Sequence, residues 1–206
     1  MKIAMVGTGY VGLVSGVCFS DFGHEVTCVD KDPGKIDRLT RGEVPIYEPG
    51  LEALMAKNVA AGSLGFTTDL AAAVAGADAV FIAVGTPTRR GDGHADLSYV
   101  MAAAEEIGRA LTGYAVIVTK STVPVGTNRK VAAALRAANP AAEFDVASNP
   151  EFLREGAAID DFMRPDRVVV GVESEKARQV MADLYRPLHA EEASGHALGV
   201  LLGAAE

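Results

Sequence analysis

The chain has 206 residues, of which 49% are apolar and 22% are charged, a balance that supports a packed core and excludes a wholly disordered protein. Its 19 basic and 27 acidic residues give a net charge of −8, which argues against binding to nucleic acid or to an anionic membrane surface. No apolar run approaches the roughly 20 residues that span a bilayer, and the stretch before the first glycine is too short for a signal peptide. We therefore expect a soluble, cytoplasmic protein.

Short β-branched runs alternate with longer helical patterns along the chain. The expected strands cover residues 3–6, 26–29, 79–84, 116–118, 146–147 and 168–170. The expected helices cover residues 11–22, 51–57, 70–75, 97–111 and 128–138. The strands are apolar almost throughout, which is typical of strands covered on both faces. The pattern predicts an α/β fold: a Rossmann-like, doubly wound, mostly parallel sheet with helices on both faces.

Residues 1–188 contain no repeat or low-complexity linker, which predicts one domain over that range. Residues 189–206 have no strong period and little bulk, so we expect an atypical tail there, either frayed or weakly helical.

A glycine-rich turn follows the first expected strand and opens the first expected helix. In Gly-Thr-Gly-Tyr-Val-Gly, Gly7 suits a tight turn, Gly9 lets the backbone approach a pyrophosphate, and Gly12 lets the helix pack close to the strand. Such a motif alone is also compatible with a purely structural turn. The second strand, however, ends at Asp30, whose carboxylate can accept the hydroxyls of an adenosine ribose, and this context predicts dinucleotide binding.

Asp30 also bears on which dinucleotide is bound. Its carboxylate would repel a 2′-phosphate, which favours NAD over NADP. Lys31 and Lys35 could partly offset such a phosphate, but NAD remains the predicted cofactor.

Three later strand ends carry loops rich in hydroxyl, amide and proline residues, namely residues 85–88, 119–127 and 148–156. Each alone is compatible with ordinary turn chemistry. Because strand ends of a parallel sheet meet at one edge, three such loops beside the glycine turn predict a site, with residues 85–88 along a nicotinamide ribose.

Longer motifs resemble a known family. They are Tyr10-Val11 in the glycine turn and the segments 45–51 (Pro-Ile-Tyr-Glu-Pro-Gly-Leu), 85–88, 95–100, 121–127, 149–156 and 165–168. In this order they resemble the NAD-binding half of the UDP-glucose/GDP-mannose dehydrogenase family, from residue 1 to about residue 188. The Ser-Thr-Val-Pro-Val-Gly-Thr and Pro-Asp-Arg-Val segments are more similar to members acting on UDP-glucose than to those acting on GDP-mannose.

The resemblance implies an activity. Family members oxidise a primary alcohol of a nucleotide sugar to a carboxylate with two NAD+, passing through a thiohemiacetal and a thioester on a cysteine, and they form homodimers or larger assemblies. The residues expected at the NAD site are Gly7, Gly9, Tyr10, Val11, Gly12, Asp30, Lys35, Gly85, Thr86, Pro87, Ser121, Thr122 and Glu155. The residues expected to touch the nucleotide sugar, UDP-glucose first, are Glu151, Phe152, Leu153, Arg154 and Glu155.

The resemblance further implies that Thr122 and Glu151 are catalytic and hold a water near the reacting carbon. Glu151 would be the general base that hydrolyses the thioester, and burial could raise its pKa toward the working range. The alternative is a carboxylate that starts a helix by accepting backbone N–H groups.

The resemblance also implies that part of the family's catalytic machinery lies outside this chain. The family's nucleophilic cysteine, with its partner aspartate and a catalytic lysine and asparagine, lies in the second half, and the resemblance implies that this chain stops before them. Cys18 and Cys28 fall in the first helix and second strand, where we expect buried, inert thiols. The histidines show no metal-ligand spacing, so no metal site is expected.

We therefore expect the chain to bind NAD without completing the oxidation. The alternatives left open are a non-catalytic NAD-binding module and the corresponding half of a GDP-mannose or N-acetyl-amino-sugar dehydrogenase.

Overall fold

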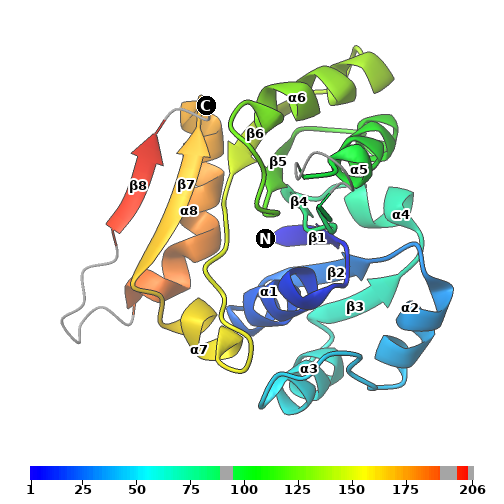
Figure 1. Ribbon diagram of the computed structural model, residues 1–206, viewed down its shortest axis with the longest axis vertical. Coiled ribbons are helices and arrows are strands. Elements are labelled where there is room, and N and C mark those ends of the chain that lie inside the picture. Colours follow the sequence, from blue (N-terminus) through cyan, green and yellow to red (C-terminus); the bar gives the residue numbers. More distant parts are fainter. Residues whose placement is uncertain (89–94, 191–198, 204–206) are drawn as a thin grey trace.

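The computed structural model describes residues 1–88, 95–190 and 199–203, and its strands and helices alternate along the chain (Figure 1). The strands are β1 (Lys2–Val6), β2 (Glu25–Val29), β3 (Leu64–Thr67), β4 (Ala79–Ile82), β5 (Ala115–Thr119), β6 (Phe144–Ser148), β7 (Arg167–Val172) and β8 (Gly199–Gly203). The helices are α1 (Tyr10–Asp21), α2 (Pro33–Thr40), α3 (Leu51–Ala60), α4 (Leu70–Val74), α5 (Ser98–Ala110), α6 (Thr127–Ala138), α7 (Ala158–Met163) and α8 (Glu175–Ala190).

The strands of the described residues form one sheet in the order β3-β2-β1-β4-β5-β6-β7-β8. Neighbours from β3 to β6 are parallel, β6 and β7 are antiparallel, and β7 and β8 are parallel. The chain winds outward from β1 in one direction and then from β4 in the other, so the order reverses between these two strands. This arrangement confirms the Rossmann-like, doubly wound fold and places the topological switch point, where ligands of such sheets bind, beside the glycine turn.

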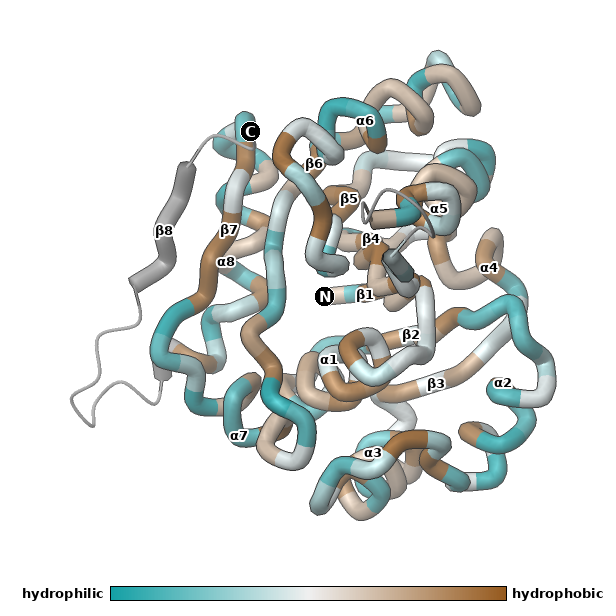
Figure 2. The backbone as a smooth tube through the Cα atoms, in the orientation of Figure 1, coloured by the Kyte–Doolittle hydropathy of each residue, from teal (hydrophilic) through white to brown (hydrophobic). Residues whose placement is uncertain are grey.

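Each face of the sheet carries its own hydrophobic core in the described part of the chain. On β1, Ile3 and Met5 join the core beneath α1, α2, α3, α7 and α8, whereas Ala4 and Val6 join the core beneath α4, α5 and α6. Figure 2 shows the hydrophobic colour along β3 and β7 and the hydrophilic colour over much of α2. Since both faces of the central strands are covered, apolar residues follow one another without polar alternation, as predicted.

Two elements near the β2–β3 edge were not predicted. Helix α2 has few apolar residues, but Asp32 caps it by accepting hydrogen bonds from the backbone N–H of Gly34 at 2.9 Å and of Lys35 at 3.3 Å. Strand β3 is short and contains a glycine, and its pairing with β2 holds it in the sheet. The cap stabilises α2 and the pairing with β2 stabilises β3, although the local sequence pattern of each segment is weak.

The C-terminal region differs from the expected frayed or weakly helical tail. Helix α8 continues to Ala190, and residues 199–203 form β8, which lies beside β7 with Val168 opposite Val200 (Figure 1). Residues 191–198 and 204–206 lie outside the described part of the chain. None of the helices described is both long and apolar enough to cross a membrane.

Candidate functional site

The glycine turn between β1 and α1 has the tight geometry that its sequence predicts. Gly7 adopts a φ of +107°, and a Cβ atom there would lie 2.6 Å from the carbonyl oxygen of Ala83. A Cβ atom on Gly12 would overlap the carbonyl oxygen of Gly7. Only glycine fits at these two positions, because the turn, the start of α1 and the end of β4 are in direct backbone contact.

Gly9 and the first turn of α1 form an open cradle. Gly9 is exposed, and a Cβ atom there would meet nothing within 4 Å, so the space beside it is free for a ligand. The helix has no side-chain cap, and the N–H of Leu13 is bonded inside the helix, to Gly9 O at 2.9 Å. The N–H groups of Tyr10, Val11 and Gly12 therefore lie at the positive end of the helix, where a diphosphate fits.

Asp30 follows β2 and is bonded directly to the glycine turn. Its Oδ2 accepts hydrogen bonds from Thr8 N at 3.0 Å and Thr8 Oγ1 at 2.7 Å, and its Oδ1 accepts from Asp32 N at 3.1 Å. Partial burial alone would raise the pKa of Asp30, but these hydrogen bonds and the nearby Lys35 ammonium outweigh it and hold the pKa below its ordinary value. An ionised acceptor therefore stands beside the cradle, as recognition of ribose hydroxyls requires.

Both lysines that could have offset a 2′-phosphate already face carboxylates. The Nζ atom of Lys31 lies 2.5 Å from Glu106 Oε1, and that of Lys35 lies 3.4 Å from Asp30 Oδ2. These pairs leave less positive charge for an additional phosphate, which agrees with NAD rather than NADP as the cofactor.

The loops that follow β4 and β5 lie against each other at the same edge of the sheet. Thr86 Oγ1 donates to the backbone oxygen of Thr122 at 3.4 Å, and Ser121 Oγ donates to that of Val84 at 2.7 Å. The carbonyl oxygen of Pro87 accepts from Asp96 N at 2.7 Å. The structure thus brings Gly85, Thr86, Pro87 and Thr122 together, while the hydroxyl of Ser121 holds the two loops in place.

A cavity of about 440 Å³ lies beyond the ends of β5 and β6. Its lining includes Lys120, Asn149, Glu151, Phe152, Leu153, Arg154, Asp161, Phe162, Arg167 and Tyr185. Glu151 Oε2 is buried and finds no hydrogen-bond partner among the described residues. Burial raises the pKa of Glu151 above its ordinary value, and the charge of Lys120 opposes this rise.

The loop after Glu151 is held mainly through Arg154, whose backbone N–H and guanidinium both donate to Asp161. Phe152 is 52% exposed, with the guanidinium of Arg167 lying 5.1 Å from its ring centroid, and Arg154 pairs with Asp161 at 2.6 Å. Glu155 is exposed and does not line the cavity. Four of the five residues expected to touch the sugar therefore share one cavity, and the fifth lies on the loop toward Tyr10.

Sequence reasoning missed the residue that anchors this loop, Glu48. Its buried carboxylate accepts from Tyr10 Oη, from Gly156 N at 2.8 Å and from Ala158 N at 2.9 Å. Burial alone would raise the pKa of Glu48, but these donors lower it below its ordinary value. Glu48, rather than Glu151, is thus the carboxylate at the start of α7, so the alternative of a helix-starting Glu151 is wrong: Glu151 precedes that helix in non-helical backbone.

The two cysteines are free thiols, fully buried, as predicted. Burial raises the pKa of both Cys18 and Cys28 to about 12. Thiolate is the reactive form, so we expect neither cysteine of the native chain to react with a thiol reagent at neutral pH, and both to react after unfolding in urea. Rapid labelling of the native chain, counted by mass spectrometry, would contradict this assignment.

Comparisons with known proteins agree with this geometry. Residues 1–189 match the NAD binding domain of the UDP-glucose/GDP-mannose dehydrogenase family. A UDP-glucose 6-dehydrogenase of Rhizobium meliloti (strain 1021) is 66% identical over 191 residues, which are 92% of this chain and 44% of that protein. The chain thus spans about half the length of the curated relatives it matches.

Two solved structures are also similar. A UDP-glucose dehydrogenase from the hyperthermophilic archaeon Pyrobaculum islandicum gives a TM-score of 0.91 at 41% identity, over 99% of this chain and 46% of that one. A ternary complex of GDP-mannose dehydrogenase from Pseudomonas aeruginosa gives a TM-score of 0.92 at 36% identity, over 100% of this chain and 47% of that one.

Proposed function

The chain belongs to the UDP-glucose/GDP-mannose dehydrogenase family through its NAD-binding domain, and from this premise we propose that it is the cofactor-binding part of a dehydrogenase that oxidises the sugar of a nucleotide sugar. UDP-glucose is the first candidate, because the relative with 66% identity is named a UDP-glucose 6-dehydrogenase. GDP-mannose is the second, because the GDP-mannose dehydrogenase structure has an equally similar fold at lower identity.

The observation that carries the proposal is the bonding of Asp30 to the glycine turn through Thr8, beside an open helix N-terminus. Asp30 would accept the adenosine ribose hydroxyls, with Lys35 alongside, and the N–H groups of Tyr10 and Val11 would donate to the diphosphate. The residues that we assign to the nicotinamide half are Gly85, Thr86, Pro87, Thr122 and Glu155.

The neighbouring cavity would hold the sugar. When bound, NAD+ supplies the acceptor for the hydride removed from the alcohol carbon. Glu151 projects an unpaired carboxylate oxygen into the buried part of this region, so it can hold a water and take its proton, with Thr122 as a second contact to that water. Phe152, Leu153 and Arg154 would form the wall against which the sugar is oriented.

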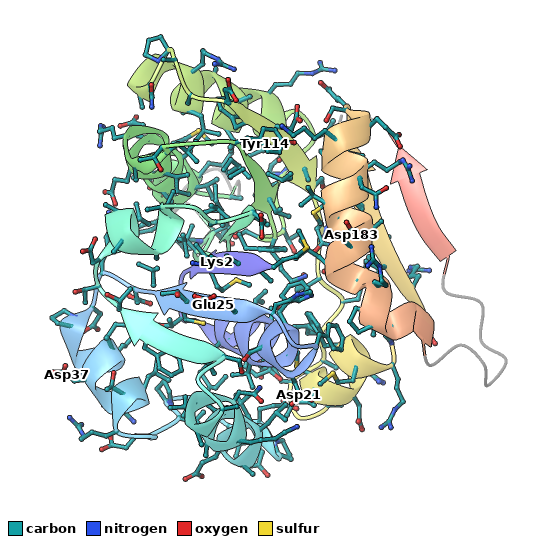
Figure 3. The ribbon with its side chains drawn as sticks, turned by 180° about the vertical axis from the view of Figure 1, so that it is seen from behind. Lys2, Asp21, Glu25, Asp37, Tyr114 and Asp183 are labelled. Atoms are coloured by element: carbon teal, nitrogen blue, oxygen red, sulfur yellow. The ribbon has the colours of Figure 1, made fainter. Side chains whose placement is uncertain are left out.

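We predict that Asp30→Ala weakens NAD+ binding about tenfold or more, because a charged acceptor contributes about 1.5–3 kcal/mol. The matched control is Asp37→Ala, which removes an exposed carboxylate from the outer side of α2 (Figure 3) and leaves the cradle intact. Calorimetric titration measures the affinity of both variants and of the unaltered chain for NAD+ and for NADP+.

Equal weakening by the two substitutions, or tighter binding of NADP+ than of NAD+ to the unaltered chain, would contradict the assignment of Asp30. Titrating the NAD-loaded chain with UDP-glucose and with GDP-mannose tests which of the two nucleotide sugars it binds more tightly. Tighter binding of UDP-glucose is expected, and a preference for GDP-mannose would favour the second candidate.

A further inference from the structure

The cavity contains a buried cation that the proposed function does not use. Lys120 directly follows β5 and is only 3% exposed. Its Nζ donates to Asn149 Oδ1 at 3.1 Å and lies 5.7 Å from the ring centroid of Phe162. Placing an ammonium in such surroundings is costly unless hydrogen bonds and an opposite charge compensate it.

The side chain of Asn149 is itself held in one orientation by hydrogen bonds, so it fixes the position of this ammonium. It is 1% exposed, its Oδ1 also accepts from Tyr185 Oη at 2.6 Å, and its Nδ2 donates to the carbonyl oxygen of Val169 at 2.9 Å. The amide therefore points its oxygen at two donors from different elements. Because Asn149 is neutral, it fixes the position of the Lys120 charge without cancelling it.

The carboxylate nearest in the chain to this clamp is Glu151, two residues after Asn149. Glu151 lines the same cavity, and its buried Oε2 has no hydrogen-bond partner among the described residues. A fixed cation and an unsatisfied carboxylate oxygen thus line the same cavity, and because both are buried their interaction is screened less than at the surface.

We propose that Lys120 is a positioning residue for Glu151: its ammonium, clamped on Asn149, supplies the positive charge that keeps the neighbouring carboxylate ionised and able to accept a proton. The inference rests on the general-base role assigned to Glu151 under the proposed function.

The other charged groups that face the cavity are weaker candidates for this role. Arg154 is paired with Asp161, Arg164 is paired with Asp160, and the side chains of both arginines are more than 70% exposed. Asp166 and Arg167 are exposed as well. Solvent screens the exposed charges, and Asp161, whose side chain is only 13% exposed, is paired with Arg154. Lys120 is therefore the dominant positive charge acting on Glu151.

Two uncharged groups complete the surroundings. Burial raises the pKa of Tyr185 and raises that of Cys18 to about 12, so both are neutral at physiological pH. Burial lowers the pKa of Lys120 to about 8, and the charge of Glu151 opposes that fall. The ammonium therefore supports the carboxylate below about pH 8 and ceases to do so above it.

The test is an NMR titration of the whole chain with carbon-13 in the glutamate carboxyl groups, with the Glu151 signal assigned by its loss in Glu151→Gln. In Lys120→Met we expect the titration midpoint of Glu151 to rise by about one pH unit or more, the usual effect of losing a nearby opposite charge. In Lys120→Arg, which keeps the charge, the midpoint should stay close to that of the unaltered chain.

A second measurement does not depend on the folding of Lys120→Met. Because coupled titrations are reciprocal, the Nζ signal of Lys120 in Glu151→Gln should titrate at lower pH than in the unaltered chain. If the titration midpoint of Glu151 is the same in Lys120→Met as in the unaltered chain, the proposal is overturned. If that variant does not fold, a Lys120 midpoint unmoved by Glu151→Gln overturns it. Failure of NAD+ to bind would instead refute the proposed function, so the two failures are distinguishable.

Discussion

Gly12→Ala is expected to destabilise the chain by about 3 kcal/mol, at the upper end of the usual range for overpacking, and to abolish NAD+ binding. The added methyl group would overlap the carbonyl oxygen of Gly7 and lie 3.2 Å from Cβ of Ala83. The first of these is a backbone atom, which cannot rotate away as a flexible side chain can. The helix would have to move off the sheet, and the glycine turn would open with it. Urea denaturation measures the stability, and calorimetry measures the binding.

Gly9→Ala is the matched control, because it adds the same methyl group to the same turn. Gly9 has a φ of −71°, which alanine adopts readily, and the new Cβ atom would meet no protein atom within 4 Å. We expect a stability loss below about 1 kcal/mol together with a clear loss of NAD+ affinity, since the methyl group fills the space left for the diphosphate. NAD+ binding unchanged by Gly9→Ala would show that the diphosphate does not approach this residue.

The elements that could be predicted are those that a short segment of the sequence identifies by itself. The runs in β1, β4 and β5 are apolar because helices cover both faces, and the turn from Gly7 to Gly12 carries its own steric requirements. Strand β8 was not predicted because residues 199–203 depend on pairing with β7, about thirty residues earlier in the chain. The antiparallel direction of β7 was not predicted either. The segment after β6 stays at the end of the sheet where β6 finishes and enters β7 from that same end, and the periodicity of the sequence does not show this.

The residues of the candidate site also differ in whether a local sequence signal identifies them. Asp30 could be predicted because it lies at a fixed distance from the glycine turn along one strand–helix–strand unit. The catalytic role of Glu151 was predicted almost entirely from the family resemblance. Lys120 and Glu48 were missed because their partners are remote: Lys120 meets Asn149 across 29 positions, and Glu48 meets Gly156 across 108. A buried carboxylate or ammonium can be identified only when the fold shows what surrounds it.

Glu48→Ala is expected to lower the free energy of unfolding by about 3 kcal/mol at neutral pH. The substitution removes the acceptor for the N–H groups of Gly156 and Ala158 and for the hydroxyl of Tyr10, and an unsatisfied buried donor costs about 1–3 kcal/mol. The loop that carries Glu151 to Glu155 would also lose its link to the glycine turn. Urea denaturation measures the loss, and amide hydrogen exchange at Gly156 and Ala158 reports on the loop.

The pH dependence tests whether ionised Glu48 is the cause. Hydrogen bonds hold its folded-state pKa below the ordinary value despite burial, so its contribution is complete above the unfolded-state pKa of about 4.3 and is lost as the pH falls through the lower folded-state value. The stability difference between the unaltered chain and Glu48→Ala should therefore be constant from neutral pH to about pH 5 and shrink below about pH 4. Tyr10→Phe removes only the phenol hydroxyl and should cost about 1 kcal/mol, because the backbone donors to Glu48 remain. A difference as large in acid as at neutral pH would mean that Glu48 stabilises the loop by packing and not as a charged acceptor.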